Sequence, residues 1–150
     1  MTRYDRALAI NRSAVSALAW SASANTWLGH ADRANELVQR AIDLSPLDPH
    51  MYSFHSIAAA AHAAAGNYDR SIAFARRSLR ENRGLTATHK VLTMSLALSG
   101  QIDDAKCVAS ELLSLEPGFT VNGFRQRYPG QQSSHVDDFC NGLSLAGVPQ

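Results

Sequence analysis

Histidine and cysteine are the side chains of this sequence best suited to catalysis or metal binding, and six His and two Cys are present. His55 and His62 are seven residues apart and share a helix face, whereas a zinc-binding helix places two His four residues apart. Cys107 and Cys140 are isolated, and their spacing matches no metal-binding motif. The sequence contains no phosphate-binding loop, nucleophile elbow or paired-cysteine motif. We therefore predict no catalytic residues, no metal and no cofactor, and expect a protein that is not an enzyme.

The elements that would position any site are set by three glycines at intervals of 37 and 34 residues. Each glycine ends an apolar stretch, and an acidic residue follows three positions later. A glycine can adopt positive φ and end a helix, and an acid is favourable near the start of the next one. Small or apolar residues recur at two further offsets, where they would let helices pack closely. The recurring positions are Gly29, Gly66 and Gly100; Asp32, Asp69 and Asp103; Ala34, Ser71 and Ala105; and Ala41, Ser78 and Leu112. This pattern predicts an all-α chain of repeated helical hairpins.

The 34-residue interval and these second-helix residues resemble the tetratricopeptide repeat (TPR) family. The early aromatic of that family is replaced here by Leu18, His55 and His89. The resemblance implies a right-handed α-solenoid of about three TPR hairpins in a single domain, 1–150. We expect a partial repeat helix over 1–11, repeats over 15–48, 52–84 and 86–119, and a C-terminal cap over 120–150.

The two ends of the chain suggest further elements. Ala7 and Leu8 precede Ala41 and Ile42 by 34 residues, so residues 1–11 read as the second helix of an earlier repeat. An array of repeats that starts in mid-unit could cover its uncapped first helix by forming a homodimer. Near the C-terminus, one apolar helix face is formed by Val136, Phe139, Cys140 and Leu143. We expect this helix to cap the third repeat rather than to enter a binding groove.

In stacked hairpins of the TPR type, the first helices line the concave side. The partner-binding residues predicted from this resemblance are Trp20, Ser23, Trp27, Ile57, Ala60, Ala64, Lys90, Val91, Met94 and Leu98. This surface is apolar and suits a hydrophobic or amphipathic segment. A clamp for a peptide carboxylate is not expected, because Lys90 is its only cation. We place Trp20 in the core more readily than Trp27.

Composition and charge narrow the partners further. With 14 basic and 13 acidic residues the net charge is +1, which argues against a general nucleic-acid-binding surface. The cluster of Arg76, Arg77, Arg80 and Arg83 reads as a solvated helix end in preference to a docking patch for an acidic partner. The apolar run over 57–65 is too short to span a membrane. The N-terminus lacks a secretion signal, so we expect a cytoplasmic protein.

The runs Leu44-Ser45-Pro46-Leu47-Asp48-Pro49 and Phe124-Arg125-Gln126-Arg127-Tyr128-Pro129 resemble the C-terminal TPR region of some bacterial signalling proteins. In those relatives the repeats follow a nucleotide cyclase domain or a winged-helix DNA-binding domain, neither of which is present here. The resemblance implies a regulatory protein–protein interaction scaffold. The alternative is a structural dimerisation or spacer module with no external ligand.

Overall fold

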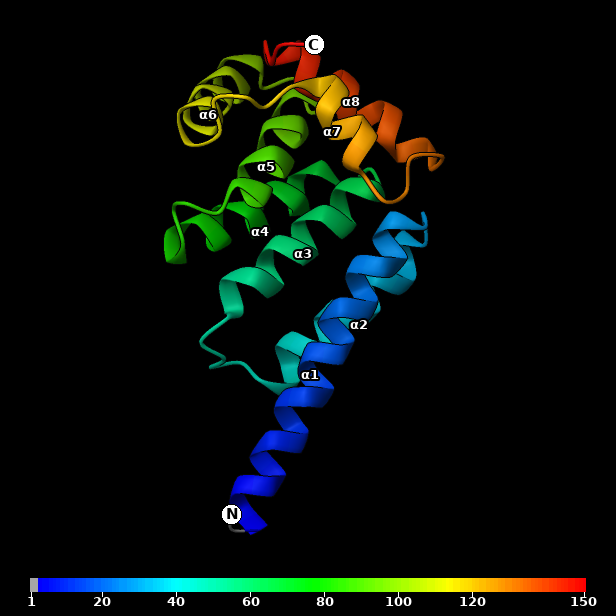
Figure 1. Cartoon of the computed structure of the whole chain (residues 1–150), viewed down its shortest axis with the longest axis vertical. Helices are drawn as coiled ribbons and strands as arrows, with labels where there is room; N and C mark the ends of the chain where they lie inside the picture. Colours follow the sequence, from blue (N-terminus) through cyan, green and yellow to red (C-terminus); the bar gives the residue numbers. More distant parts are fainter. Residues whose placement is uncertain (1–2) are drawn as a thin grey trace.

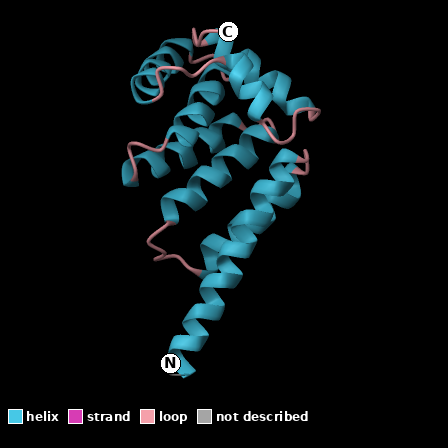
Figure 2. Ribbon diagram, in the orientation of Figure 1, coloured by secondary structure: helices cyan, strands magenta, loops and turns pink. Residues whose placement is uncertain are grey.

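The computed structural model describes residues 3–150, which form eight α-helices and no strand (Figures 1 and 2). The helices are α1 (Arg3–Trp27), α2 (Ala31–Leu44), α3 (Met51–Ala64), α4 (Tyr68–Glu81), α5 (Thr86–Leu98), α6 (Ile102–Leu115), α7 (Val121–Arg127) and α8 (Ser134–Leu145). The first six helices pair as the hairpins α1–α2, α3–α4 and α5–α6, and each hairpin packs on the next. The predicted all-α solenoid is confirmed.

The glycine positions turn the chain as predicted. Gly29, Gly66 and Gly100 have φ values of 82°, 78° and 89°, which are favourable only for glycine. At each turn the backbone N–H of the following residue bonds to a carbonyl five residues earlier, at 2.8–2.9 Å. This bond is typical of a Schellman helix end. The same local chemistry therefore closes the first helix of all three hairpins.

The recurring small residues are fully buried between the helices. Residues with 0% exposure include Ala22, Ala59 and Thr93 on the first helices, and Ala34, Ser71, Ala105, Ala41, Ser78 and Leu112 on the second helices. The buried apolar residues form two clusters, one around α1, α2 and the start of α3, the other from α3 to α8. Phe74 of α4 touches both clusters. The core is therefore distributed along the stack, with no single centre.

Buried serines link α4 to its neighbours on both sides. Ser71 Oγ lies 2.9 Å from Ser95 Oγ on α5, and Ser78 Oγ donates to a backbone carbonyl of α3 at 2.8 Å. A buried helical serine can instead bond back to its own helix, but here the tertiary partners are used. At the equivalent positions between the first two hairpins, Ala34 and Ala61 are both fully buried. The pair of hydroxyls is thus found between the second and third hairpins and not between the first and second.

The structure corrects the prediction for the N-terminal segment. Residues 3–11 do not form a separate helix but continue into α1, which runs unbroken to Trp27 (Figure 1). Met1 and Thr2 lie outside the described residues. The reason is local, since the sequence has no Gly or Pro between Arg3 and Leu28 to end a helix. The first described buried side chain of α1 is Val15, and Asn11–Ala14 are exposed.

Candidate functional site

A groove runs along the first helices of the three hairpins and consists of two adjoining hollows that share Ser23, Ser56, Ile57 and Ala87. The open end, about 590 Å³, is also lined by Arg12, Ser16, Ala19, Trp20, Asp48, Pro49, His50, Ser53, Phe54 and Leu85. The closed end, about 380 Å³, is also lined by Thr26, Trp27, Ala60, Lys90, Val91, Met94, Phe119, Phe124, Arg127, Tyr128, Pro129 and Phe139. The first helices therefore do share one hollowed surface.

Most of the predicted partner-binding residues meet at the closed end. They are Ser23, Trp27, Ile57, Ala60, Lys90, Val91 and Met94. Trp20 lines only the open end and is 70% exposed, so our placement of this residue in the core is wrong. Trp27 is half-buried. Ala64 and Leu98 are half-buried and line neither end.

The C-terminal tail, residues 119–150, closes one end of the groove. Its helix α8 packs on α5, the first helix of the third hairpin, and not on α6 (Figure 1). A Cβ on Gly142 would lie 2.9 Å from Met94 O, so the glycine permits close contact between α8 and α5. Met94 is only 1% exposed, and Phe139 of α8 lines the groove. The expectation that this helix stays out of the groove is therefore wrong.

The tail residues that wall the closed end were not predicted as binding residues from the sequence. The aromatic rings of Phe119, Phe124, Tyr128 and Phe139 form a chain of contacts with centroids 5.4–6.3 Å apart. The density of aromatic residues in this short segment was the available signal, because aromatic residues are scarce elsewhere in the chain. That density indicates a cluster, but it does not show which helix the cluster faces.

The tail also touches the first hairpin, far away in sequence. Ser133 Oγ donates a hydrogen bond to Trp27 O at 2.8 Å. At Gly130 the backbones approach so closely that a Cβ would overlap the Trp27 carbonyl oxygen. Contacts of the tail with both α1 and α5 give the closed end walls from three parts of the chain, while the hollow itself stays partly open to solvent.

Polar contacts fix the tail internally. Tyr128 OH lies 2.8 Å from His135 Nε2, and Arg125 Nη1 donates to Asp137 Oδ1 at 2.7 Å. Burial lowers the pKa of His135, a shift partly opposed by Asp138, and burial raises the pKa of Tyr128. A neutral His135 accepting from the Tyr128 hydroxyl is consistent with both shifts.

Lys90 reaches the closed end from α5. Its Nζ lies 3.0 Å from Glu116 Oε2 and 4.7 Å from the centroid of the Phe119 ring. The Glu116 oxygen is buried and makes no aligned hydrogen bond, so the contact with Lys90 is an ion pair. The charge of Lys90 is thus already balanced within the protein.

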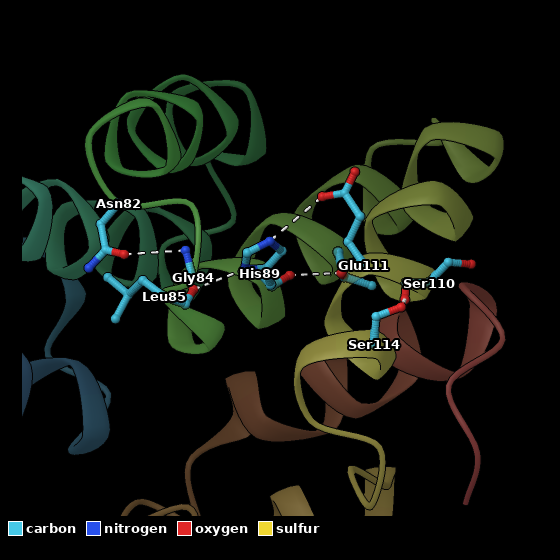
Figure 3. A network of polar contacts seen from close by, with 8 residues as sticks. Asn82, Gly84, Leu85, His89, Ser110, Glu111 and Ser114 are labelled. Carbon is cyan, nitrogen blue, oxygen red and sulfur yellow. Dashed lines mark hydrogen bonds and ion pairs between the residues drawn. The ribbon is translucent and has the colours of Figure 1, made fainter.

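The histidines that the sequence offered for catalysis or metal binding pack against other helices. His89 is 3% exposed, its Nδ1 donates to Leu85 O at 3.0 Å, and its Nε2 lies 3.6 Å from Glu111 Oε2 (Figure 3). His55 and His62 contact the Phe74 ring, and burial lowers the pKa of each. Within residues 3–150 no three His, Cys, Asp or Glu side chains are grouped closely enough to share a metal ion.

The arginine cluster divides between two environments. Arg76, Arg80 and Arg83 line a shallow hollow with His89 and Glu111, and none of these residues lines the groove. The Arg77 guanidinium instead lies 5.6 Å from the centroid of the Phe74 ring. Glu111 offsets part of the positive charge of the hollow.

The structure resembles that of MamA, a helical repeat protein. The TM-score is 0.65 at 18% sequence identity, with 95% of this chain and 82% of the MamA chain covered. No family model and no curated protein match the sequence. The fold and this likeness are compatible with the TPR family. No helix among the described residues is both long and apolar enough to cross a bilayer.

Proposed function

We propose that the chain is a non-catalytic interaction scaffold that binds an apolar or amphipathic helical segment of a protein partner in the open end of the groove. The observation that carries this proposal is the exposed Trp20 ring in the groove wall. Burying a large aromatic side chain stabilises a complex strongly, and tryptophan is over-represented among residues that dominate binding energy. Leaving it exposed beside other apolar groove residues is typical of an interaction surface.

The shape of the open end supports a helical partner. Most of its lining comes from α1 and α3, the rest from the loop before α3 and the start of α5, and Ser16, Ala19 and Ser53 contribute small side chains. Small side chains allow the backbone of a second helix to approach, while Trp20 and Ile57 provide apolar contacts. The tail covers Met94, so a partner helix would contact the groove on the side of α1 and α3.

Affinity capture from cell lysate tests this role with two matched variants. Trp20→Ala should lose a specific partner that the unchanged chain retains. Leu47→Ala, which removes a 95% exposed apolar side chain outside the groove, should retain it. Because Trp20 is exposed, its replacement should leave the melting temperature nearly unchanged. Equal capture by all three proteins would contradict the proposal.

The resemblance to the repeat regions of bacterial signalling proteins supports a regulatory role for such a scaffold. A dimerisation or spacer module is the second candidate, favoured by the exposed stretch Asn11–Ala14 of α1. Analytical ultracentrifugation separates the two candidates. A stable dimer together with equal capture by all three proteins would favour the second one.

A further inference from the structure

The closed end of the groove has an aromatic wall that the segment-binding role does not use. Five aromatic side chains line it, in a chain with only two Trp, four Tyr and five Phe. They are Trp27, Phe119, Phe124, Tyr128 and Phe139. Such a gathering around a hollow is typical of small-molecule sites, which are mostly apolar with a few placed polar groups.

The size of the closed end matches that of small-molecule sites. Its volume of about 380 Å³ falls in the range of ligand cavities, roughly 300 to 1,000 Å³. A small molecule of one or two rings fits this space.

The walls indicate an apolar body for this molecule. The Thr26 hydroxyl donates to Ala22 O at 3.0 Å, and the Tyr128 hydroxyl is paired with His135. These two hydroxyls therefore already have partners, and the hydroxyls of Ser23 and Ser56 are the others in the wall. A ligand that offered many hydrogen-bonding groups would lose its bonds to water without replacement.

The charges at the closed end indicate one anionic group. Lys90 and Arg127 are the charged lining residues, and no carboxylate lines this end. Lys90 is paired with Glu116. Arg127 uses Nε to donate to Gly123 O at 3.1 Å and forms no ion pair among the described residues. Its remaining N–H groups can bind an anion at the mouth of the cavity.

We propose that the closed end binds a small organic monoanion with an apolar, ring-sized body. The body lies among the aromatic side chains, and the anionic group pairs with Arg127. Such a ligand contacts Trp27 of α1 and Tyr128 of the tail at once. Binding therefore stabilises the docked tail and raises the melting temperature as ligand is added.

Two fluorescent probes test the site on the isolated protein. 8-Anilinonaphthalene-1-sulfonate is an aromatic monoanion, and N-phenyl-1-naphthylamine has the same ring system without charge. We expect one sulfonate probe per chain, bound more tightly than the neutral probe. Arg127→Gln should weaken the sulfonate probe roughly three- to tenfold and leave the neutral probe unchanged.

Arg125→Gln is the matched control, because Arg125 lies two residues away on α7 and pairs with Asp137 outside the cavity. It should leave both probes unchanged. Ala87→Phe, at an exposed position that lines the cavity, should weaken both probes while circular dichroism stays the same. Equal affinities for the two probes, equal effects of the two arginine variants, or no effect of Ala87→Phe would overturn the proposal. Trp20→Ala should not change probe binding, so this site and the segment-binding role can fail independently.

Discussion

Replacing Gly130 by Ala should detach the tail from the first hairpin without unfolding the protein. The added Cβ would overlap the carbonyl oxygen of Trp27, and the atoms nearest to it are all backbone atoms. No side-chain rotation can relieve this overlap, so the segment must move away from α1. The movement breaks the 2.8 Å hydrogen bond from Ser133 Oγ to Trp27 O.

The expected cost follows from that bond. A neutral hydrogen bond contributes about 0.5 to 1.5 kcal/mol, and each kcal/mol shifts the melting temperature of a chain of this size by about 2 to 4 °C. The packing of α8 on α5 does not involve Gly130 and should persist. Thermal melting should therefore show a drop of a few degrees, while circular dichroism at low temperature stays unchanged.

Hydrogen–deuterium exchange locates the effect. Amides of residues 129–134 should exchange faster in the Gly130→Ala variant, and amides of α8 should not. Gly118→Ala is the matched control, because a Cβ on Gly118 would meet no atom within 4 Å. If the two variants behave alike in melting and exchange, the close approach between the tail and α1 does not exist in solution.

Two further predictions concern buried polar contacts. Ser71→Ala and Ser95→Ala should each lower the free energy of unfolding in urea by about 1 kcal/mol, because each leaves a buried hydroxyl without its partner. The double variant should cost no more than either single one. Additive costs would show that the two hydroxyls do not interact. Burial lowers the pKa of His135 from the usual 6.5, so its contribution to stability is present above pH 6.5 and lost as the pH falls through the lowered value. Melting temperatures between about pH 7.5 and about pH 5 should fall less for His135→Gln, which keeps an acceptor for the Tyr128 hydroxyl, and equal slopes would contradict this assignment.

The repeat register could be predicted because its causes are local. Gly29 and its counterparts adopt positive φ for a reason that belongs to glycine itself. Ala34 and Ala41 are seven residues apart on one helix face, so a helix places both against its neighbour wherever that neighbour lies. The TPR resemblance, in turn, named seven of the residues that line the closed end of the groove, all of them on the first helices and none in the tail.

The sequence by itself therefore determined the helices from α2 to α6, the glycine turns of the hairpins and the buried small residues of the second helices. The tertiary structure alone decided that α8 lies on α5, because an amphipathic face indicates that a helix is covered without indicating by what. It also decided that Trp20, in the wall of the open end, is exposed, because the face that a helix buries depends on which segments pack against it. Both outcomes depend on contacts between segments far apart in sequence, and these contacts formed the closed end of the groove.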